Sequence, residues 1–211
     1  MEPFIRVDQF NFISRQARNL VNGHATSNDK GVKQTIKSMA IERVLALFPE
    51  LTAEQEELLQ PIITIKDKED QEVYLAQLKK FVIPFKVTEQ GMKKLFPKVK
   101  KLKPPVIEKL DLQELCYLSW IDYSSNKKFI VIQSNGKLLG VYGSFDPIQQ
   151  KGICSLCNGH EEVGLFLAEK KGQVQGTFTK RGNYICRDSE ACNHNMTSLD
   201  KLEEFVERLK A

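Results

Sequence analysis

The sequence lacks the motifs that would indicate an enzyme. It contains no phosphate-binding loop and no G-x-G-x-x-G, H-E-x-x-H or G-x-S-x-G motif, each of which supplies groups that a particular chemistry requires. Cys116 is the one cysteine outside two clusters, and its apolar strand pattern favours burial over nucleophilic catalysis. His24 lies in a loop rich in glycine, asparagine and serine, which favours a turn residue over a general base. We therefore predict that the protein is not an enzyme.

Long apolar runs are also missing. No uncharged apolar segment approaches the roughly 20 residues that span a bilayer. Residues 1–6 lack the basic start of a secretory signal peptide, and no apolar segment follows them. We therefore expect a cytoplasmic, monomeric protein without membrane contact. The net charge of +4 over 211 residues is too small to indicate nucleic-acid binding by itself.

The positive charge is concentrated in one stretch. Seven lysines crowd around Pro104-Pro105, namely Lys93, Lys94, Lys98, Lys100, Lys101, Lys103 and Lys109. Such a run could contact ribosomal RNA or an acidic protein surface, whereas most charge runs are simply solvated. Only Phe96 supplies an aromatic ring within it, so the interleaving typical of nucleic-acid binding is thin. An RNA-binding function through this stretch remains the alternative to the function inferred below.

Four cysteines form two clusters. Cys154 and Cys157 are a C-x2-C pair, and Cys186 and Cys192 are a C-x5-C pair after a spacer of 28 residues. Four thiolates suit tetrahedral Zn²⁺, and a two-residue spacer lets one turn direct two sulfurs at one point. We predict one structural zinc ion, because four thiolates leave no coordination position for water or substrate.

Other assignments of the clusters remain open at this stage. The four cysteines could form two disulfides, although a reducing cytosol favours metal. The C-x5-C spacing is longer than the C-x2-C usual in zinc ribbons, and His160 or His194 could replace a cysteine as ligand. We read both histidines as surface loop residues.

The first part of the chain has helical periodicity. Apolar residues recur at steps of three and four from Val7, and Asn22-Gly23-His24 closes this helix. A second helix is expected from about residue 29 to Phe48-Pro49, and Thr52 with Gln55 predicts a capping box that starts a third. Pro61 bends or ends the third helix, and a fourth covers 68–82. Four amphipathic helices predict a bundle over residues 1–83.

The second part has the pattern of strands. Segments 115–120 and 129–132 are β-rich, and Asn135-Gly136 is a hairpin signal before 138–142. Further strands are expected at 163–168, 174–179 and 184–185, and Ser198 caps a closing helix to about Leu209. Residues 84–211 therefore form an α+β domain, with 84–105 as a basic connector. The order of knuckle, hairpin, second cysteine pair and helix is that of a treble-clef zinc finger.

A basic and aromatic patch accompanies the second cysteine pair. Zinc would hold this hairpin rigid, and rigid aromatic and arginine side chains suit a protein-binding hot spot. The simpler alternative is that Phe178 or Tyr184 packs beneath the finger. The patch comprises Phe178, Lys180, Arg181, Tyr184 and Arg187.

The cysteine-containing segments resemble one known family. The resemblance is carried by 151–157, 180–189 and Cys192-Asn193, and it extends to 28–30, 125–128 and 140–143. In these residues the chain is similar to the elongation factor G-binding proteins, which include the staphylococcal fusidic-acid-resistance proteins.

The resemblance implies a helical bundle followed by a treble-clef zinc domain, with Cys154, Cys157, Cys186 and Cys192 as ligands. It also implies binding to the C-terminal part of elongation factor G and release of that factor from ribosomes stalled by fusidic acid. The ribosome would be contacted only indirectly, with at most a weak RNA contact from the connector. By position, the resemblance assigns Lys180, Tyr184, Arg187 and Phe205 to the partner surface. Phe178 and Arg181 are added on their chemistry alone.

Overall fold

The chain forms two compact units, Met1–Ile83 and Pro84–Ala211. A computed structural model describes residues 1–171 and 177–210. Each unit has its own core. In the described ranges, no helix is both long and apolar enough to cross a membrane.

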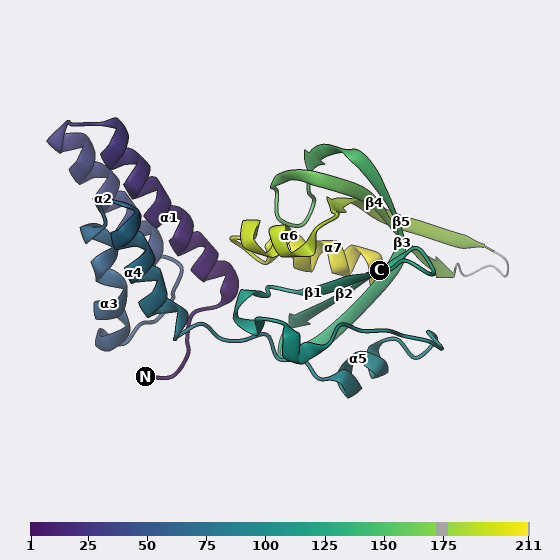
Figure 1. The fold of residues 1–211 in the computed structure, drawn as a ribbon. Helices are drawn as coiled ribbons and strands as arrows, with labels where there is room; N and C mark the ends of the chain where they lie inside the picture. Colours follow the sequence, from purple (N-terminus) through teal and green to yellow (C-terminus); the bar gives the residue numbers. More distant parts are fainter. Residues whose placement is uncertain (172–176, 211) are drawn as a thin grey trace. The chain divides into compact units, whose positions relative to one another are not determined.

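The first unit is a bundle of four α-helices (Figure 1). A 3₁₀ helix, η1 (Gln60–Thr64), continues from α3 at Pro61, which suits the first turn of a helix because its missing N–H would lack a partner there. The bounds are α1 (Val7–Thr26), α2 (Lys30–Leu45), α3 (Ala53–Leu59) and α4 (Lys68–Lys79).

Local hydrogen bonds fix where these helices begin. The hydroxyl of Thr52 accepts from the backbone N–H of Gln55, and the side chain of Gln55 accepts from that of Thr52, which confirms the predicted capping box. Gly23 does not close α1 as predicted. It lies within the helix, where its missing side chain leaves room for Ile36 of α2.

The second unit is built on a five-stranded antiparallel sheet. Its strands follow one another in the order β1-β2-β3-β4-β5, which confirms the predicted meander. Asn135 and Gly136 both have positive φ, as a tight hairpin turn requires. The strands are β1 (Leu118–Asp122), β2 (Lys127–Ser134), β3 (Lys137–Ile153), β4 (His160–Lys171) and β5 (Phe178–Cys186).

Several strand bounds differ from those predicted. The strand expected at 115–120 begins only at Leu118, because the backbone N–H groups of Cys116 and Tyr117 donate to the side chain of Asn193. β3 continues far beyond residue 142, with an irregularity between Pro147 and Lys151. Residues 174–176, half of the strand expected at 174–179, lie outside the described residues, and Phe178 begins β5.

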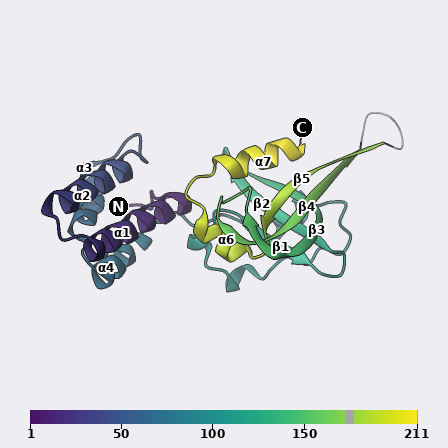
Figure 2. The ribbon, with the colours of Figure 1, turned by 90° about the horizontal axis from the view of Figure 1, so that it is seen from above.

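Helices cover both faces of the sheet. Figures 1 and 2 show α6 (Ser189–Asn195) and α7 (Asp200–Lys210) on one face, and Figure 1 shows the short α5 (Glu89–Leu95) on the other. Phe205 of α7 packs on Phe166 of β4, with ring centroids 5.8 Å apart. Phe96, beside α5, makes edge contacts with Trp120 and Phe129 at 6.0 and 5.1 Å.

Residues 84–105 are therefore more than a linker between units. Phe85, Met92 and Phe96 are buried in the same apolar cluster as Phe129 of β2. Burying such side chains stabilises the fold by about 1.5–3 kcal/mol each. The basic connector is thus anchored to one face of the sheet.

Candidate metal centre and the adjoining sheet surface

The four predicted ligands meet at one point. Every pair among the Sγ atoms of Cys154, Cys157, Cys186 and Cys192 lies within 4.8 Å. The pairs Cys154–Cys192 and Cys157–Cys186 are 3.8 and 3.7 Å apart. Tetrahedral coordination with Zn–S bonds of about 2.3 Å requires sulfur separations of about 3.8 Å. The cluster therefore has the size and the chemistry of a zinc site.

Turn geometry places the first two sulfurs. The backbone N–H of Cys154 donates to the carbonyl of Gly159 at 3.0 Å, and that of Asn158 donates to the carbonyl of Cys154 at 2.9 Å. Asn158 has a φ of 60°, which asparagine tolerates better than most residues. This knuckle follows β3 directly.

The other two sulfurs come from the end of β5 and from α6. Cys186 is the last residue of β5, and Cys192 lies within α6. Asp188 caps the start of α6, where its carboxylate accepts from the backbone N–H of Glu190 at 2.8 Å. The C-x5-C spacing is thus long enough for the chain to leave a strand and begin a helix.

Backbone donors favour thiolates at this centre. The N–H groups of Leu156 and Cys186 each lie 3.3 Å from Sγ of Cys154, and the N–H of Gly159 lies 3.4 Å from Sγ of Cys157. Hydrogen bonding with Cys157 lowers the pKa of the Cys154 thiol, whereas hydrogen bonding with Cys154 raises the pKa of Cys192. Four adjacent thiolates repel one another, so full ionisation calls for a cation.

The geometry decides between the alternatives left open by the sequence. A disulfide needs an S–S distance of about 2.05 Å, and none of the five cysteines forms one. The metal-binding cluster found among the described residues contains no histidine. Instead, Nε2 of His194 lies 3.9 Å from a carboxylate oxygen of Glu114.

A buried lysine, Lys128, connects the sheet to the second pair of ligands. Its Nζ donates to the carbonyls of Cys186 and Arg187 at 3.1 and 2.9 Å and to the hydroxyl of Ser189 at 3.1 Å. It also lies 4.8 Å from the centre of the Phe145 ring. Burial lowers the pKa of Lys128 to about 8. This side chain holds the turn between β5 and α6, and hence the relative positions of Cys186 and Cys192.

We expect Lys128→Met to weaken zinc binding by roughly 10- to 100-fold, as losses of outer-shell partners do elsewhere. The methionine fills much of the space but leaves two carbonyls without their donor. Competition with a chromophoric chelator measures the affinity. Lys137→Met is the matched control, because Lys137 is exposed at the β2–β3 turn. Equal affinity for the two variants would contradict this role.

Asn193, the residue after the last cysteine, joins α6 to the start of β1. Its Oδ1 accepts from the backbone N–H groups of Cys116 and Tyr117 at 2.7 and 3.1 Å. Its Nδ2 donates to the carbonyls of Tyr117 and Ser189 at 3.1 and 2.8 Å. Sequence reasoning assigned no role to Asn193 or Lys128. The sequence offered one signal for each residue. Lys128 is a lysine at the start of an apolar strand, and Asn193 is an asparagine next to a zinc ligand.

The structure places part of the predicted patch on one face of the sheet. Alternate residues of a strand share a face, so Phe178, Lys180 and Tyr184 of β5 lie together. Phe178 is 55% exposed and Tyr184 is 44% exposed. Neither ring packs beneath the finger.

The other predicted patch residues lie elsewhere. Arg181 belongs to the opposite face of β5, where its guanidinium donates to the carbonyl of Arg208 in α7 at 2.9 Å. Arg187 follows β5 and pairs with Glu162 at 3.4 Å. Phe205 is only 2% exposed, so its ring supports the sheet from inside and is not presented to a partner.

Fold and site together define a helical-bundle protein with a treble-clef zinc finger and one structural zinc ion. The model of an elongation factor G-binding protein N-terminal domain matches residues 4–86, and that of an FBP C-terminal treble-clef zinc finger matches residues 97–209. The chain therefore belongs to the elongation factor G-binding protein family.

A solved structure shows the same architecture. The structure of the fusidic acid resistance protein FusC is 33% identical in sequence and superimposes with a TM-score of 0.86. The match covers 97% of this chain and 96% of the FusC chain. The comparison of this sequence with curated proteins found no match.

Proposed function

We propose that this protein binds translation elongation factor G through the exposed face of its zinc finger and promotes release of the factor from ribosomes stalled by fusidic acid. Three observations support the proposal: membership of a family named for binding this factor, the overall likeness to FusC, and a surface suited to a protein partner. Resistance would arise by protection of the drug's target, without chemistry on the drug.

The observation that carries the proposal is the exposure of Phe178 and Tyr184 on one face of β5. Six residues of an antiparallel strand span about 20 Å, so the two rings can reach separate points of one interface. Lys180 lies between them and is paired with Glu169 at 3.9 Å. Exposed aromatic side chains with charged neighbours are typical of binding hot spots.

The zinc site makes the Tyr184 end of this surface rigid. Tyr184 lies two residues before the ligand Cys186. Its carbonyl accepts from the backbone N–H of Ser155, in the knuckle that carries Cys154 and Cys157, at 2.9 Å. A side chain on a fixed backbone loses little freedom on binding, so more of its contact energy appears as affinity. We therefore place the principal contact at Tyr184. Arg187, which follows β5 and pairs with Glu162, is proposed as a secondary contact.

Release would follow from conformational preference. A ligand shifts an equilibrium only by its differential affinity for the two states. We propose that the protein prefers a conformation of the factor other than the one that fusidic acid stabilises on the ribosome. Each increment of about 1.4 kcal/mol in this preference shifts the equilibrium between the two conformations tenfold. The C-terminal domains of the factor are the proposed contact.

Calorimetric titration of the zinc-loaded protein with elongation factor G tests the proposal. We expect one-to-one binding, and we expect Tyr184→Ala to weaken it by roughly 10- to 100-fold, the usual range for a hot-spot aromatic. Tyr123→Ala is the matched control, because Tyr123 is 80% exposed at the β1–β2 turn of the same unit.

Two results would count against the proposal. If the unaltered protein does not bind elongation factor G, the factor is not its partner. If Tyr184→Ala and Tyr123→Ala lose equal affinity, Tyr184 does not belong to the contact surface. The release step has its own test: the protein should accelerate dissociation of labelled factor from fusidic-acid-stalled ribosomes, and equal affinity for both states of the factor would rule out a population shift.

A further inference from the structure

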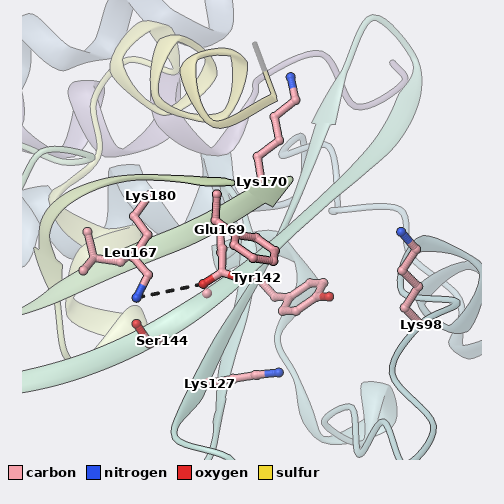
Figure 3. Close-up of a pocket in the computed structure, with 10 residues that line it drawn as sticks. Lys98, Lys127, Tyr142, Ser144, Leu167, Glu169, Lys170 and Lys180 are labelled. Atoms are coloured by element: carbon pink, nitrogen blue, oxygen red, sulfur yellow. Dashed lines mark ion pairs between the residues drawn. The ribbon is translucent and has the colours of Figure 1, made fainter. Parts of the chain in front are cut away.

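An open cleft of about 620 Å³ lies beside the connector on the sheet face that carries Phe178 and Lys180. Strands β2 to β5 form most of its wall, and Lys98 of the connector closes one side. Figure 3 shows Lys98 and Lys127 on either side of the Tyr142 ring, and the ion pair of Lys180 with Glu169. Clefts of about 300–1,000 Å³ hold small molecules and cofactor-sized groups.

The charge of the cleft favours an anion. Three ammonium groups, those of Lys98, Lys127 and Lys180, line it together with the single carboxylate of Glu169. That carboxylate is already paired with Lys180. A fourth lysine of the lining, Lys170, donates to the carbonyl of Lys210 at 2.8 Å, so its charge is directed toward the end of α7.

Two aromatic rings give the cleft an additional specificity for flat groups. Tyr142 is held in place by Phe129, stacked at 5.5 Å, and by the edge of Phe96 at 5.9 Å. Lys127 lies 5.4 Å from the centre of the Tyr142 ring. Phe178 lines the same cleft and is more than half exposed. The exposed Phe178 ring is suited to stacking with a nucleobase, and the Tyr142 ring, which lies between Phe129 and Lys127, forms part of the wall beside it.

The connector extends this positive charge along a fixed path. Its apolar side chains Met92 and Phe96 are buried, and Val99 and Leu102 pack against the same cluster. Its exposed lysines therefore project from an anchored backbone, in contrast to a mobile tail. They are Lys93, Lys94, Lys98, Lys100, Lys101 and Lys103.

We propose that this cleft and the connector lysines bind single-stranded RNA, with phosphates along the lysines and a base in the cleft against Tyr142 and Phe178. An acidic peptide would match the lysines, but its carboxylates would leave the exposed Phe178 ring without a stacking partner. The RNA site shares Phe178 and Lys180 with the surface proposed for elongation factor G, but Lys98 and Lys127 belong to the RNA site alone. It does not require Tyr184 or Arg187.

Fluorescence anisotropy with a labelled 12-nucleotide oligouridine tests the proposal on the full zinc-loaded chain. Affinity should fall with salt, and each lost phosphate contact should lower the logarithmic salt slope by about 0.7. We expect that reduction for Lys98→Ala and for Lys127→Ala. Phe178→Ala should instead weaken binding about 5- to 100-fold at one salt concentration with the slope unchanged.

Lys151→Ala is the matched control, because Lys151 is an exposed lysine of β3 outside the cleft. The proposal is overturned if the Lys151 variant loses as much slope as the Lys98 variant. It is also overturned if a 12-residue polyglutamate competes as well as unlabelled RNA. Calorimetry with elongation factor G separates the two functions, since Lys98→Ala should bind the factor as the unaltered protein does.

Discussion

Replacement of Cys192 by serine should abolish stoichiometric zinc binding and unfold the second unit. The four sulfurs lie within 4.8 Å of one another, and among residues 1–171 and 177–210 the cluster contains no other ligand that could take the fourth position. Structural zinc contributes about 10–16 kcal/mol in zinc-finger peptides, which is comparable with the whole stability of a domain, about 5–15 kcal/mol. Zinc content by elemental analysis and thermal unfolding by circular dichroism measure the two losses.

Cys116→Ser is the control for this experiment. Cys116 is buried but lies outside the cluster, so the variant should retain one zinc ion per chain and lose about 1 kcal/mol of stability, as typical substitutions do. Chelation of the unaltered protein should reproduce the Cys192→Ser result. Retention of zinc and of a cooperative transition by the Cys192 variant would contradict the four-thiolate site.

Replacement of Asn193 by alanine should destabilise the second unit by about 3–5 kcal/mol. The amide forms four hydrogen bonds to buried or half-buried backbone groups, and each buried group left without a partner costs about 1–3 kcal/mol. We expect a loss smaller than the largest sum of these four costs, because the surrounding backbone relaxes in part after the amide is removed. Denaturant unfolding followed by the fluorescence of Trp120, the single tryptophan, measures the loss.

Asn183→Ala is the appropriate comparison, because the Asn183 side chain is exposed on β5 and accepts a local hydrogen bond from the adjacent N–H of Tyr184. Its cost should be below about 1 kcal/mol. Similar losses for the two asparagine variants would mean that the connection between α6 and β1 does not depend on the Asn193 amide.

The sequence was sufficient for features encoded by local spacing. The four helices of the first unit, the hairpin at Asn135-Gly136 and the treble-clef order follow from periodicity, caps and turn residues. The same holds for the identity of the four ligands, because the C-x2-C pair and the C-x5-C pair are both visible in the sequence.

The predicted partner surface shows where local pattern is insufficient. Phe178, Lys180 and Tyr184 remain together because alternate residues of one strand share a face. Arg181 belongs to the same run of sequence, yet it lies on the side covered by α7. Phe205 was assigned to the surface by resemblance, and the sheet buries it.

By itself, then, the sequence determined the zinc ligands, the order of the elements and the family to which the chain belongs. The tertiary structure alone decided which side chains of β5 are exposed, that Lys128 and Asn193 are buried supports of the finger, and that the connector is fixed beside a cationic cleft. The physical reason is the distance along the chain over which each interaction acts. Ligand spacing, caps and turns act between neighbours in the chain, whereas burial depends on which segment from elsewhere packs against a given face.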